Sequence, residues 1–238
     1  MAIDIHTLAI IPARMGSEGI PHKNFRKLLG ISPTERAITA AVAAQIPQVV
    51  LSTDAPLSWF CDDARISWQD RPAALATGTT TMSEVVQYVL AHVPGPDDQM
   101  IVLLQPTQPL RTSVHITDAL TLLQRPDTDS VVSVVALPPT HHPVWQYLID
   151  ARDGGRLHHQ AHQRPGDVQT RRQVLPTTYI RDGTVYAFWR RTVRVYRGIY
   201  GKVIRPLVIQ AAETCALDTL EDWAEAERRL LVQAGKRN

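Results

Sequence analysis

The sequence predicts an α/β fold with a doubly wound, mostly parallel sheet. Short apolar runs rich in β-branched residues alternate with amphipathic segments along most of the 238 residues. The apolar runs are nearly continuous, which is typical of strands buried on both faces of a parallel sheet. Such sheets bind ligands beyond the carboxyl ends of their strands, so we expect a site in the loops that follow the strands.

The predicted strands are of two kinds. Valine, isoleucine and leucine dominate the first kind, which comprises residues 8–12, 48–52, 100–104 and 130–136. The second kind contains shorter apolar runs and comprises residues 145–149, 183–189, 202–209 and 215–217. These segments supply the strands of the predicted sheet.

The segments between the strands carry helix start signals. Residues 32–35 form a capping box with proline at the first helical position, which predicts a helix toward residue 44. Residues 81–84 predict a second helix to about residue 92, and Ser113 precedes an apolar stripe at helical spacing. A last helix is predicted over residues 220–232, with an apolar face made by Leu220, Trp223, Ala224, Leu230 and Leu231.

We interpret residues 1–238 as a single domain with an insertion at residues 137–181. The insertion is polar and rich in histidine, arginine and glutamine. A structureless segment of this length is unusual inside a compact domain, so we expect it to have a functional or interface role.

Composition excludes several classes of protein. A net charge of +2 gives no support for nucleic acid or a membrane surface as a partner. Cys61 and Cys215 are far apart and lack metal-ligand spacing, which predicts reduced thiols and a cytoplasmic setting. Adjacent histidines without cysteines are weak evidence for zinc. No apolar stretch approaches the ~20 residues of a membrane span.

Residues 10–24 are the most informative stretch. An apolar run stops at Pro12, and the loop that follows carries glycines and three potential phosphate ligands, Arg14, Lys23 and Asn24. Backbone N–H groups approach an anion closely where no Cβ intervenes, and cations neutralise its charge. The spacing of a P-loop and that of the dinucleotide fingerprint are both absent. Taken alone, the loop also fits a solvated basic surface.

The order of several motifs resembles that of the CMP-sugar-acid cytidylyltransferases, and among them the CMP-N-acetylneuraminate (sialic acid) synthetases. The segment Leu-Gln-Pro-Thr-x-Pro-Leu-Arg-Thr at residues 104–112 is particularly specific. The matching segments are residues 12–24, 51–54, 71–79, 104–112, 130–134, 141–143, 183–186 and 217–223. The resemblance implies transfer of CMP from CTP to an acidic small-molecule acceptor of the sialic acid type, with Mg²⁺ and release of pyrophosphate. It also implies a homodimer, in which residues 137–181 reach the active site of the neighbouring subunit.

The resemblance also implies roles for particular residues. It makes Arg14, Lys23 and Asp218 catalytic, with the two cations at the β- and γ-phosphates of CTP and Asp218 as the Mg²⁺ ligand. The residues implied to bind the nucleotide are Arg14, Gly16, Ser17, Lys23, Asn24, Arg71 and Thr79. Those implied to bind the acceptor are Gln105, Arg111 and Arg172. From the residues alone, Arg111 could equally pair with a nearby carboxylate, and Arg172 could lie on a solvated face.

The chain departs from the family pattern at several positions. Ala216 replaces the first carboxylate of an Asp-x-Asp-Thr motif, which leaves open weaker Mg²⁺ binding, a single ion, or recruitment of Glu213 or Glu221. The other departures are Glu18 in place of a lysine, Asp182 in place of an asparagine, and the loop around Gly78 and Met82. Three alternatives therefore remain at this point: a sialic acid type of acceptor, another acceptor such as an octulosonic acid or a phosphonate, and a noncatalytic nucleotide-binding homologue.

Overall fold

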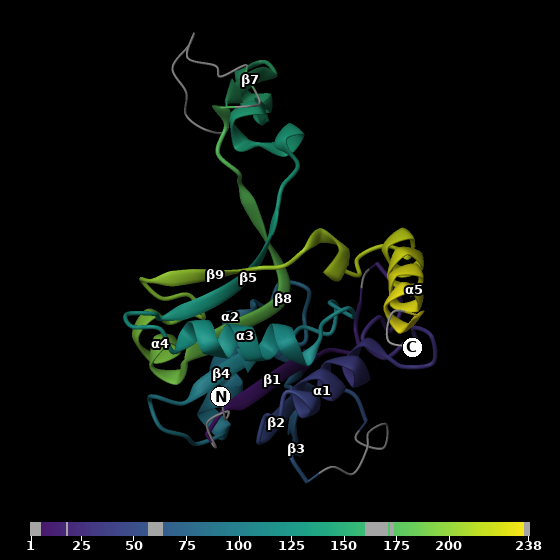
Figure 1. Cartoon of the computed structure of the whole chain (residues 1–238), viewed down its shortest axis with the longest axis vertical. Helices are drawn as coiled ribbons and strands as arrows, with labels where there is room; N and C mark the ends of the chain where they lie inside the picture. The colour runs from purple at the N-terminus through teal and green to yellow at the C-terminus, as the bar shows by residue number, and fades with distance from the viewer. Residues whose placement is uncertain (1–5, 18, 57–63, 160–170, 172–173, 236–238) are drawn as a thin grey trace.

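A computed structural model describes residues 6–17, 19–56, 64–159, 171 and 174–235 (Figure 1). Its centre is a seven-stranded sheet with the order β3-β2-β1-β4-β8-β5-β9. All neighbouring strands are parallel except β8, which is antiparallel to both β4 and β5. The predicted fold class is confirmed. The strands are β1 (Leu8–Ala13), β2 (Gln48–Thr53), β3 (Ile66–Asp70), β4 (Met100–Leu103), β5 (Ser130–Ala136), β8 (Tyr179–Trp189) and β9 (Ile204–Val208).

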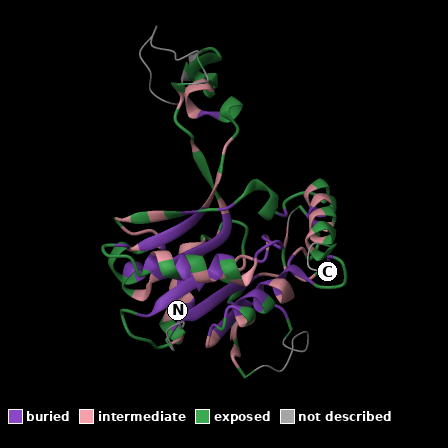
Figure 2. Ribbon diagram, viewed as in Figure 1, coloured by how far each residue is buried: buried purple, intermediate pink, exposed green. Residues whose placement is uncertain are grey.

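Helices cover both faces of the sheet, which explains why the strands are apolar throughout. In β1, Ala9 and Ile11 join the cluster formed with α1 (Pro33–Ala43) and α3 (Ser113–Leu123). Leu8 and Ile10 join the opposite cluster, formed with α2 (Met82–His92) and α4 (Arg190–Tyr196). Figure 2 shows the strands as a buried layer between exposed helix faces. Successive side chains of a strand point to opposite faces, so both sets must be apolar here.

Local capping sets where two of the helices begin. Ser32 Oγ accepts a hydrogen bond from the Glu35 N–H at 3.2 Å, and the Glu35 carboxylate accepts from the Ser32 N–H at 2.6 Å. Thr81 and Glu84 repeat this reciprocal arrangement at the start of α2. Both capping boxes satisfy N–H groups that the first helical turn leaves without partners.

The predicted insertion begins as an arm that extends away from the sheet (Figure 1). Its described part contains an antiparallel pair, β6 (Tyr147–Asp150) and β7 (Arg156–His159), joined by a short 3-10 turn. The strand predicted at residues 145–149 therefore lies two residues later. Four large apolar side chains on this pair are 46–72% exposed, namely Tyr147, Leu148, Ile149 and Leu157.

Three details of the secondary structure differ from the prediction. Residues 215–217 form no strand but a loop, and β8 begins at Tyr179 because its first residues pair with the end of β5. The edge strand β3 and helix α4 were not predicted, since β3 is mostly polar and α4 is only seven residues long. No helix in the described part of the chain is long and apolar enough to cross a membrane.

The last helix, α5 (Leu220–Gly235), packs through a narrower face than predicted. Leu220 and Leu231 are 58% and 61% exposed, and Ala224 is also exposed. Trp223 is buried as predicted, together with Ala226, which was not predicted, and both pack against the loop that follows β1. The apolar face therefore serves to attach α5 to that loop rather than to the main core.

Candidate active site

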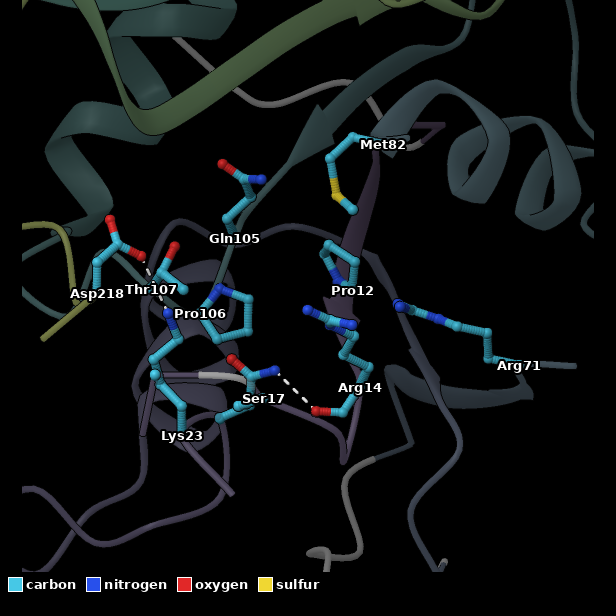
Figure 3. Close-up of a pocket in the computed structure, with 12 residues that line it drawn as sticks. Pro12, Arg14, Ser17, Lys23, Arg71, Met82, Gln105, Pro106, Thr107 and Asp218 are labelled. Atoms are coloured by element: carbon cyan, nitrogen blue, oxygen red, sulfur yellow. Dashed lines mark hydrogen bonds and ion pairs between the residues drawn. The ribbon is translucent and has the colours of Figure 1, made fainter. Parts of the chain in front are cut away.

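A cavity of about 340 Å³ opens at the carboxyl ends of β1 and β4 (Figure 3). Arg14 and Arg71 lie on one side of it, Lys23 and Asp218 on the other, and Gln105 and Met82 above them. We call this cavity the nucleotide pocket. Its lining residues are Pro12, Arg14, Ser17, Gly19, Lys23, Asn24, Arg71, Met82, Gln105, Pro106, Thr107 and Asp218.

The loop of residues 14–24, the phosphate loop, is held by two hydrogen bonds at its start. The Met15 N–H donates to Asp54 Oδ1 at 2.7 Å, from the loop that follows β2. Asn24 is buried, and its Nδ2 donates to the Arg14 carbonyl at 2.9 Å, which ties the two ends of the loop together. One bond thus comes from outside the loop and the other joins its two ends, and together they fix the loop that carries Arg14 and Lys23.

Lys23 connects the phosphate loop to the chain just before α5. Its Nζ donates to the Leu217 carbonyl at 2.5 Å and lies 3.1 Å from Asp218 Oδ1. The Lys23 side chain is 15% exposed, whereas that of Asp218 is 75% exposed. The Asp218 carboxylate thus retains open coordination sites on the pocket side while one oxygen faces the ammonium group (Figure 3).

Asp218 reaches the pocket because the residues around it are anchored. Leu217 is fully buried, and its N–H donates to the Thr107 carbonyl at 2.9 Å. Thr219 and Asp222 form a reciprocal cap at the start of α5, with the Asp222 carboxylate accepting from the Thr219 N–H at 2.8 Å. Hydrogen bonds from the Thr219 and Asp218 N–H groups hold the pKa of Asp222 below its ordinary value, against the opposing effect of burial.

Close backbone contact also defines this part of the pocket. A Cβ on Gly19 would lie 2.5 Å from the Asp218 carbonyl oxygen, which is shorter than any real contact. Only glycine allows the phosphate loop to approach the segment before α5 this closely. Gly19 lines the pocket, whereas Gly16 does not and has nothing within 4 Å of its Cβ position.

Arg71 is buried at the opposite wall. Its Nη2 donates to the Ser52 carbonyl at 2.8 Å, and the residue is 3% exposed. Burial lowers the pKa of Arg71 to about 10; the Asp54 carboxylate opposes this shift and Arg14 adds to it. Arg71 remains cationic at neutral pH, and its hydrogen bond to Ser52 of β2 fixes the position of the guanidinium group.

Gln105 follows β4, and its backbone carbonyl accepts a hydrogen bond from Arg111. The Arg111 guanidinium donates to the carbonyls of Gln105 and Thr184, both at 2.5 Å, and it is 7% exposed. Burial lowers the pKa of Arg111 to about 9, partly offset by Asp182. A Cβ on Gly183 would lie 3.0 Å from Gln105 Oε1, so glycine leaves room for the amide. Arg111 lies outside the lining of the nucleotide pocket.

The structure brings together most of the residues singled out in the sequence. The ones that line the nucleotide pocket are Arg14, Ser17, Lys23, Asn24, Arg71, Gln105 and Asp218. Three others do not line it: Gly16, Thr79 and Arg111. Thr79 is exposed and hydrogen-bonds the Thr77 hydroxyl at 3.1 Å. Arg172 and Glu18 lie outside the described residues.

The pocket also contains residues that sequence reasoning did not place in the site. These are Pro12, Gly19, Met82, Pro106 and Thr107. Four of them belong to the motifs of residues 12–24 and 104–112, so their position after a strand was the available signal. Met82 belongs to the loop that departs from the family pattern, so the sequence marked this segment without predicting that the Met82 side chain lines the pocket. Here its side chain enters the pocket beside Pro12 (Figure 3).

Within the described part of the chain, the pocket offers one carboxylate to a Mg²⁺ ion, so most ligands of a bound ion would be phosphate oxygens and water. Asp218 is the one carboxylate among the described residues that line the pocket, and no group of three His, Cys, Asp or Glu gathers elsewhere in the described ranges. Mg²⁺ commonly uses one or two carboxylates together with phosphate oxygens and water. Glu213 and Glu221 do not line the pocket. Asp182 accepts hydrogen bonds from Thr184.

Comparisons with known proteins identify relatives of this chain. An N-acylneuraminate cytidylyltransferase of Streptococcus agalactiae (strain NEM316) is 36% identical over 130 residues, covering 53% of this chain. This chain spans only 31% of that relative's length. The CMP-N,N'-diacetyllegionaminic acid synthase of Legionella pneumophila is 30% identical over 230 residues, covering 93% of this chain and 94% of the relative.

Solved structures share the fold at low sequence identity. A CMP:2-keto-3-deoxy-manno-octonic acid synthetase complexed with CTP has a TM-score of 0.64 and 16% identity, covering 96% of this chain and 99% of that one. The 2-C-methyl-D-erythritol 4-phosphate cytidylyltransferase of Francisella tularensis has a TM-score of 0.62 and 11% identity, covering 94% and 99%. The sequence profile described as "Cytidylyltransferase" matches residues 8–197. The chain belongs to the cytidylyltransferase family of nucleotidyltransferases.

Proposed function

We propose that this chain transfers CMP from CTP to an acidic sugar of the sialic acid or nonulosonic acid type, releasing pyrophosphate. The observation that carries the proposal is the arrangement of charge in the nucleotide pocket. Arg14, Lys23 and Arg71 line it with a single described carboxylate, that of Asp218. A triphosphate is the kind of ligand that such a cationic pocket attracts, and transfer from it requires positioning more than covalent chemistry.

In this reaction a hydroxyl oxygen of the acceptor forms a bond to the α-phosphorus, and the bond from that phosphorus to the β-phosphate oxygen breaks. The hydroxyl proton is lost, and pyrophosphate leaves with the bonding electrons. Arg14 and Lys23 would stabilise the negative charge that moves onto pyrophosphate. Arg71, held by the Ser52 carbonyl, would contact the cytidine end of the nucleotide.

The acceptor would approach from the side of Gln105, which lines the upper part of the pocket (Figure 3). Asp218 would hold Mg²⁺, which neutralises phosphate charge when bound. The Lys23 ammonium is then free to move from the Asp218 carboxylate toward the phosphates, since an ion of charge +2 satisfies that carboxylate better.

The direct test is a pyrophosphate-release assay with CTP, Mg²⁺ and a panel of acidic sugars. The panel contains N-acetylneuraminic acid, a diacetylated legionaminic acid, an octulosonic acid and a phosphonate. We expect turnover with a nonulosonic acid. Turnover with the octulosonic acid or phosphonate alone would replace the acceptor class, and folded protein that is silent across the panel would contradict the proposal.

A noncatalytic nucleotide-binding role is the second candidate, and one observation favours it. Ala216 leaves the chain without the first carboxylate of the family's metal motif, and no other described carboxylate takes its place in the pocket. Calorimetric titration of CTP with and without Mg²⁺ separates the two candidates. CTP binding that is tight and independent of Mg²⁺, without pyrophosphate release, identifies the noncatalytic binding role.

The arm supports a homodimer as part of this proposal. Its hairpin carries exposed Leu148, Ile149 and Leu157, which a monomer would leave in water. In a dimer these side chains would be covered by the second subunit. Sedimentation of the wild type and of Ile149→Asp tests this: we expect a dimer that the aspartate dissociates, and a monomeric wild type would contradict it.

A further inference from the structure

A second cavity, of about 230 Å³, lies among α1, the start of α3 and the end of α5. The polar residues that matter in its wall are Arg36, Arg111, Thr112, Ser113 and Gln233. No aspartate or glutamate is among the described residues that line it. The described lining itself therefore carries two positive charges and no negative one, although Asp182 acts on Arg111 and Glu35 on Arg36 from outside the lining. We call this the arginine cavity.

Arg111 has unused hydrogen-bonding capacity at this cavity. Its Nε and Nη2 donate to carbonyl oxygens, whereas its Nη1 is buried and has no hydrogen-bond partner within the described ranges. A buried donor without a partner costs about 1–3 kcal/mol, so native proteins rarely leave one unsatisfied. The side chain is 93% buried, and its charge cannot be screened by bulk water as a surface arginine's would be.

Arg36, which also lines this cavity, shows the same feature. Its Nη2 donates to the Leu28 carbonyl at 2.7 Å, while its Nε is buried and lacks a partner in the described part of the chain. Both arginines thus use part of the guanidinium to fix themselves to backbone carbonyls. Each guanidinium therefore keeps a cationic N–H group without a partner among the described residues, and an anion could bind to it.

The start of α3 adds a third source of positive potential. Ser113 is the first residue of this 11-residue helix, and Thr112 precedes it as the cap. The first N–H groups of a helix have no intrahelical partners, and the helix dipole places partial positive charge at this end. Two arginines, a helix start and the hydroxyl of Ser113 therefore converge on one cavity.

We propose that the arginine cavity is a binding site for a phosphate-sized oxyanion, separate from the nucleotide pocket. The ligand class follows from the donors: guanidinium groups and helix N–H groups recognise tetrahedral oxyanions, either free or at the end of a small phosphomonoester. The cavity, of about 230 Å³, is smaller than the nucleotide pocket of about 340 Å³, which agrees with a smaller ligand. The bound anion would contact the arginine that holds the Gln105 carbonyl, 2.5 Å from its Nη2.

The test measures binding of inorganic phosphate and of glycerol 3-phosphate by calorimetry, on protein saturated with CTP so that the nucleotide pocket is occupied. Arg36→Gln removes one charge, and we expect it to weaken binding about tenfold. Ser113→Asp adds a negative charge at a helix position that favours aspartate, so it should abolish binding without unfolding the protein. Arg125→Gln removes the same charge from an exposed position elsewhere and is the matched control.

Weaker binding in Arg36→Gln and loss of binding in Ser113→Asp, with binding intact in Arg125→Gln, support the site. Tighter binding of the phosphomonoester identifies a phosphorylated metabolite as the ligand, and tighter binding of phosphate identifies the free ion. The proposal is overturned if CTP-saturated wild type shows no saturable binding, or if the three variants bind alike. Circular dichroism of each variant shows that the comparison is made on folded protein.

Discussion

The ammonium group of Lys23 lies 3.1 Å from Asp218 Oδ1, although the two residues are 195 positions apart. The pair joins the phosphate loop after β1 to the segment before α5 across the floor of the nucleotide pocket (Figure 3). Both partners have a further role in the proposed reaction, one toward phosphate and one toward Mg²⁺. Their contact is thus a resting arrangement that substrate would exchange for stronger interactions.

The close approach behind this pair predicts that Gly19→Ala is damaging. The new Cβ would meet the Asp218 carbonyl at 2.5 Å, so the phosphate loop and Asp218 must separate. A displacement of about 1 Å in a reacting site costs on the order of 100-fold in rate. We expect a loss of turnover of that order, measured by pyrophosphate release, together with weaker CTP binding.

The matched control is Gly16→Ala in the same loop. Nothing lies within 4 Å of the Cβ that this substitution adds. We expect its melting temperature to equal that of the wild type. If Gly16→Ala and Gly19→Ala lower the melting temperature equally, steric contact with Asp218 is not what requires Gly19.

Restoring the missing carboxylate with Ala216→Asp tests how the metal is held. Position 216 is exposed and lies two residues before Asp218, next to the anchored Leu217. A second carboxylate near the first should strengthen Mg²⁺ binding, because it adds an anionic ligand that Mg²⁺ prefers. We expect the Mg²⁺ concentration at half-maximal rate to fall. An unchanged Mg²⁺ requirement would mean that position 216 does not reach the ion.

Arg111→Met is expected to destabilise the fold. The substitution removes the donors to both carbonyls: the Gln105 carbonyl keeps the Gln108 N–H at 3.4 Å, whereas the Thr184 carbonyl loses a buried partner. An unsatisfied buried acceptor costs about 1–3 kcal/mol, so the free energy of unfolding should fall by about 3 kcal/mol in urea denaturation. Arg125→Met, at an exposed position, should change it little. Equal losses in the two variants would argue against the structural role of Arg111.

The ion pairs of α5 predict a loss of stability in acid. Glu225 accepts hydrogen bonds from Arg228 and Arg229, which lower its pKa from 4.5 to about 2. A carboxylate whose pKa is lower in the folded state than in the unfolded state stabilises the fold at pH values above its unfolded pKa. This contribution is lost as the pH falls from about 4.5 toward 2. The melting temperature of the wild type should therefore drop toward that of Glu225→Gln over this range. A gap between the two that stays constant with pH would contradict the assignment.

Some of the fold followed directly from local sequence. Continuous apolar runs identified β1, β2, β4 and β5, because a strand buried on both faces must be apolar at every position. The capping box at Ser32 and Glu35 located the start of α1 in the same way, through contacts four residues apart or less. Residues 215–217 were wrongly predicted as a strand, since a short apolar run resembles a strand, whereas the Leu217 N–H donates to the Thr107 carbonyl in the loop after β4.

The candidate site also combines features that the sequence predicted with features that depend on the tertiary structure. Its cationic loop after β1 and the glutamine after β4 were identifiable in the sequence, because loops at the carboxyl ends of parallel strands are where ligands bind. The position of the Met82 side chain in the pocket and the close approach of Gly19 to Asp218 were not, since both depend on which residues face them in the fold. Arg111 was ambiguous in the sequence, and its position under Gln105 became clear only when the strand carrying Thr184 was placed beside it.

The amino-acid sequence by itself determined the layered α/β architecture, the helix starts and the family, because periodicity, caps and motif order are local properties of the chain. The tertiary structure decided which charges share a cavity. Lys23 meets Asp218, and Arg36 and Arg111 line one cavity, only because packing of Trp223 and Leu217 against Ile20 and of α1 beside α3 brings distant segments together. Electrostatic interaction depends on distance through space and on burial, and neither quantity is encoded in any short stretch of sequence.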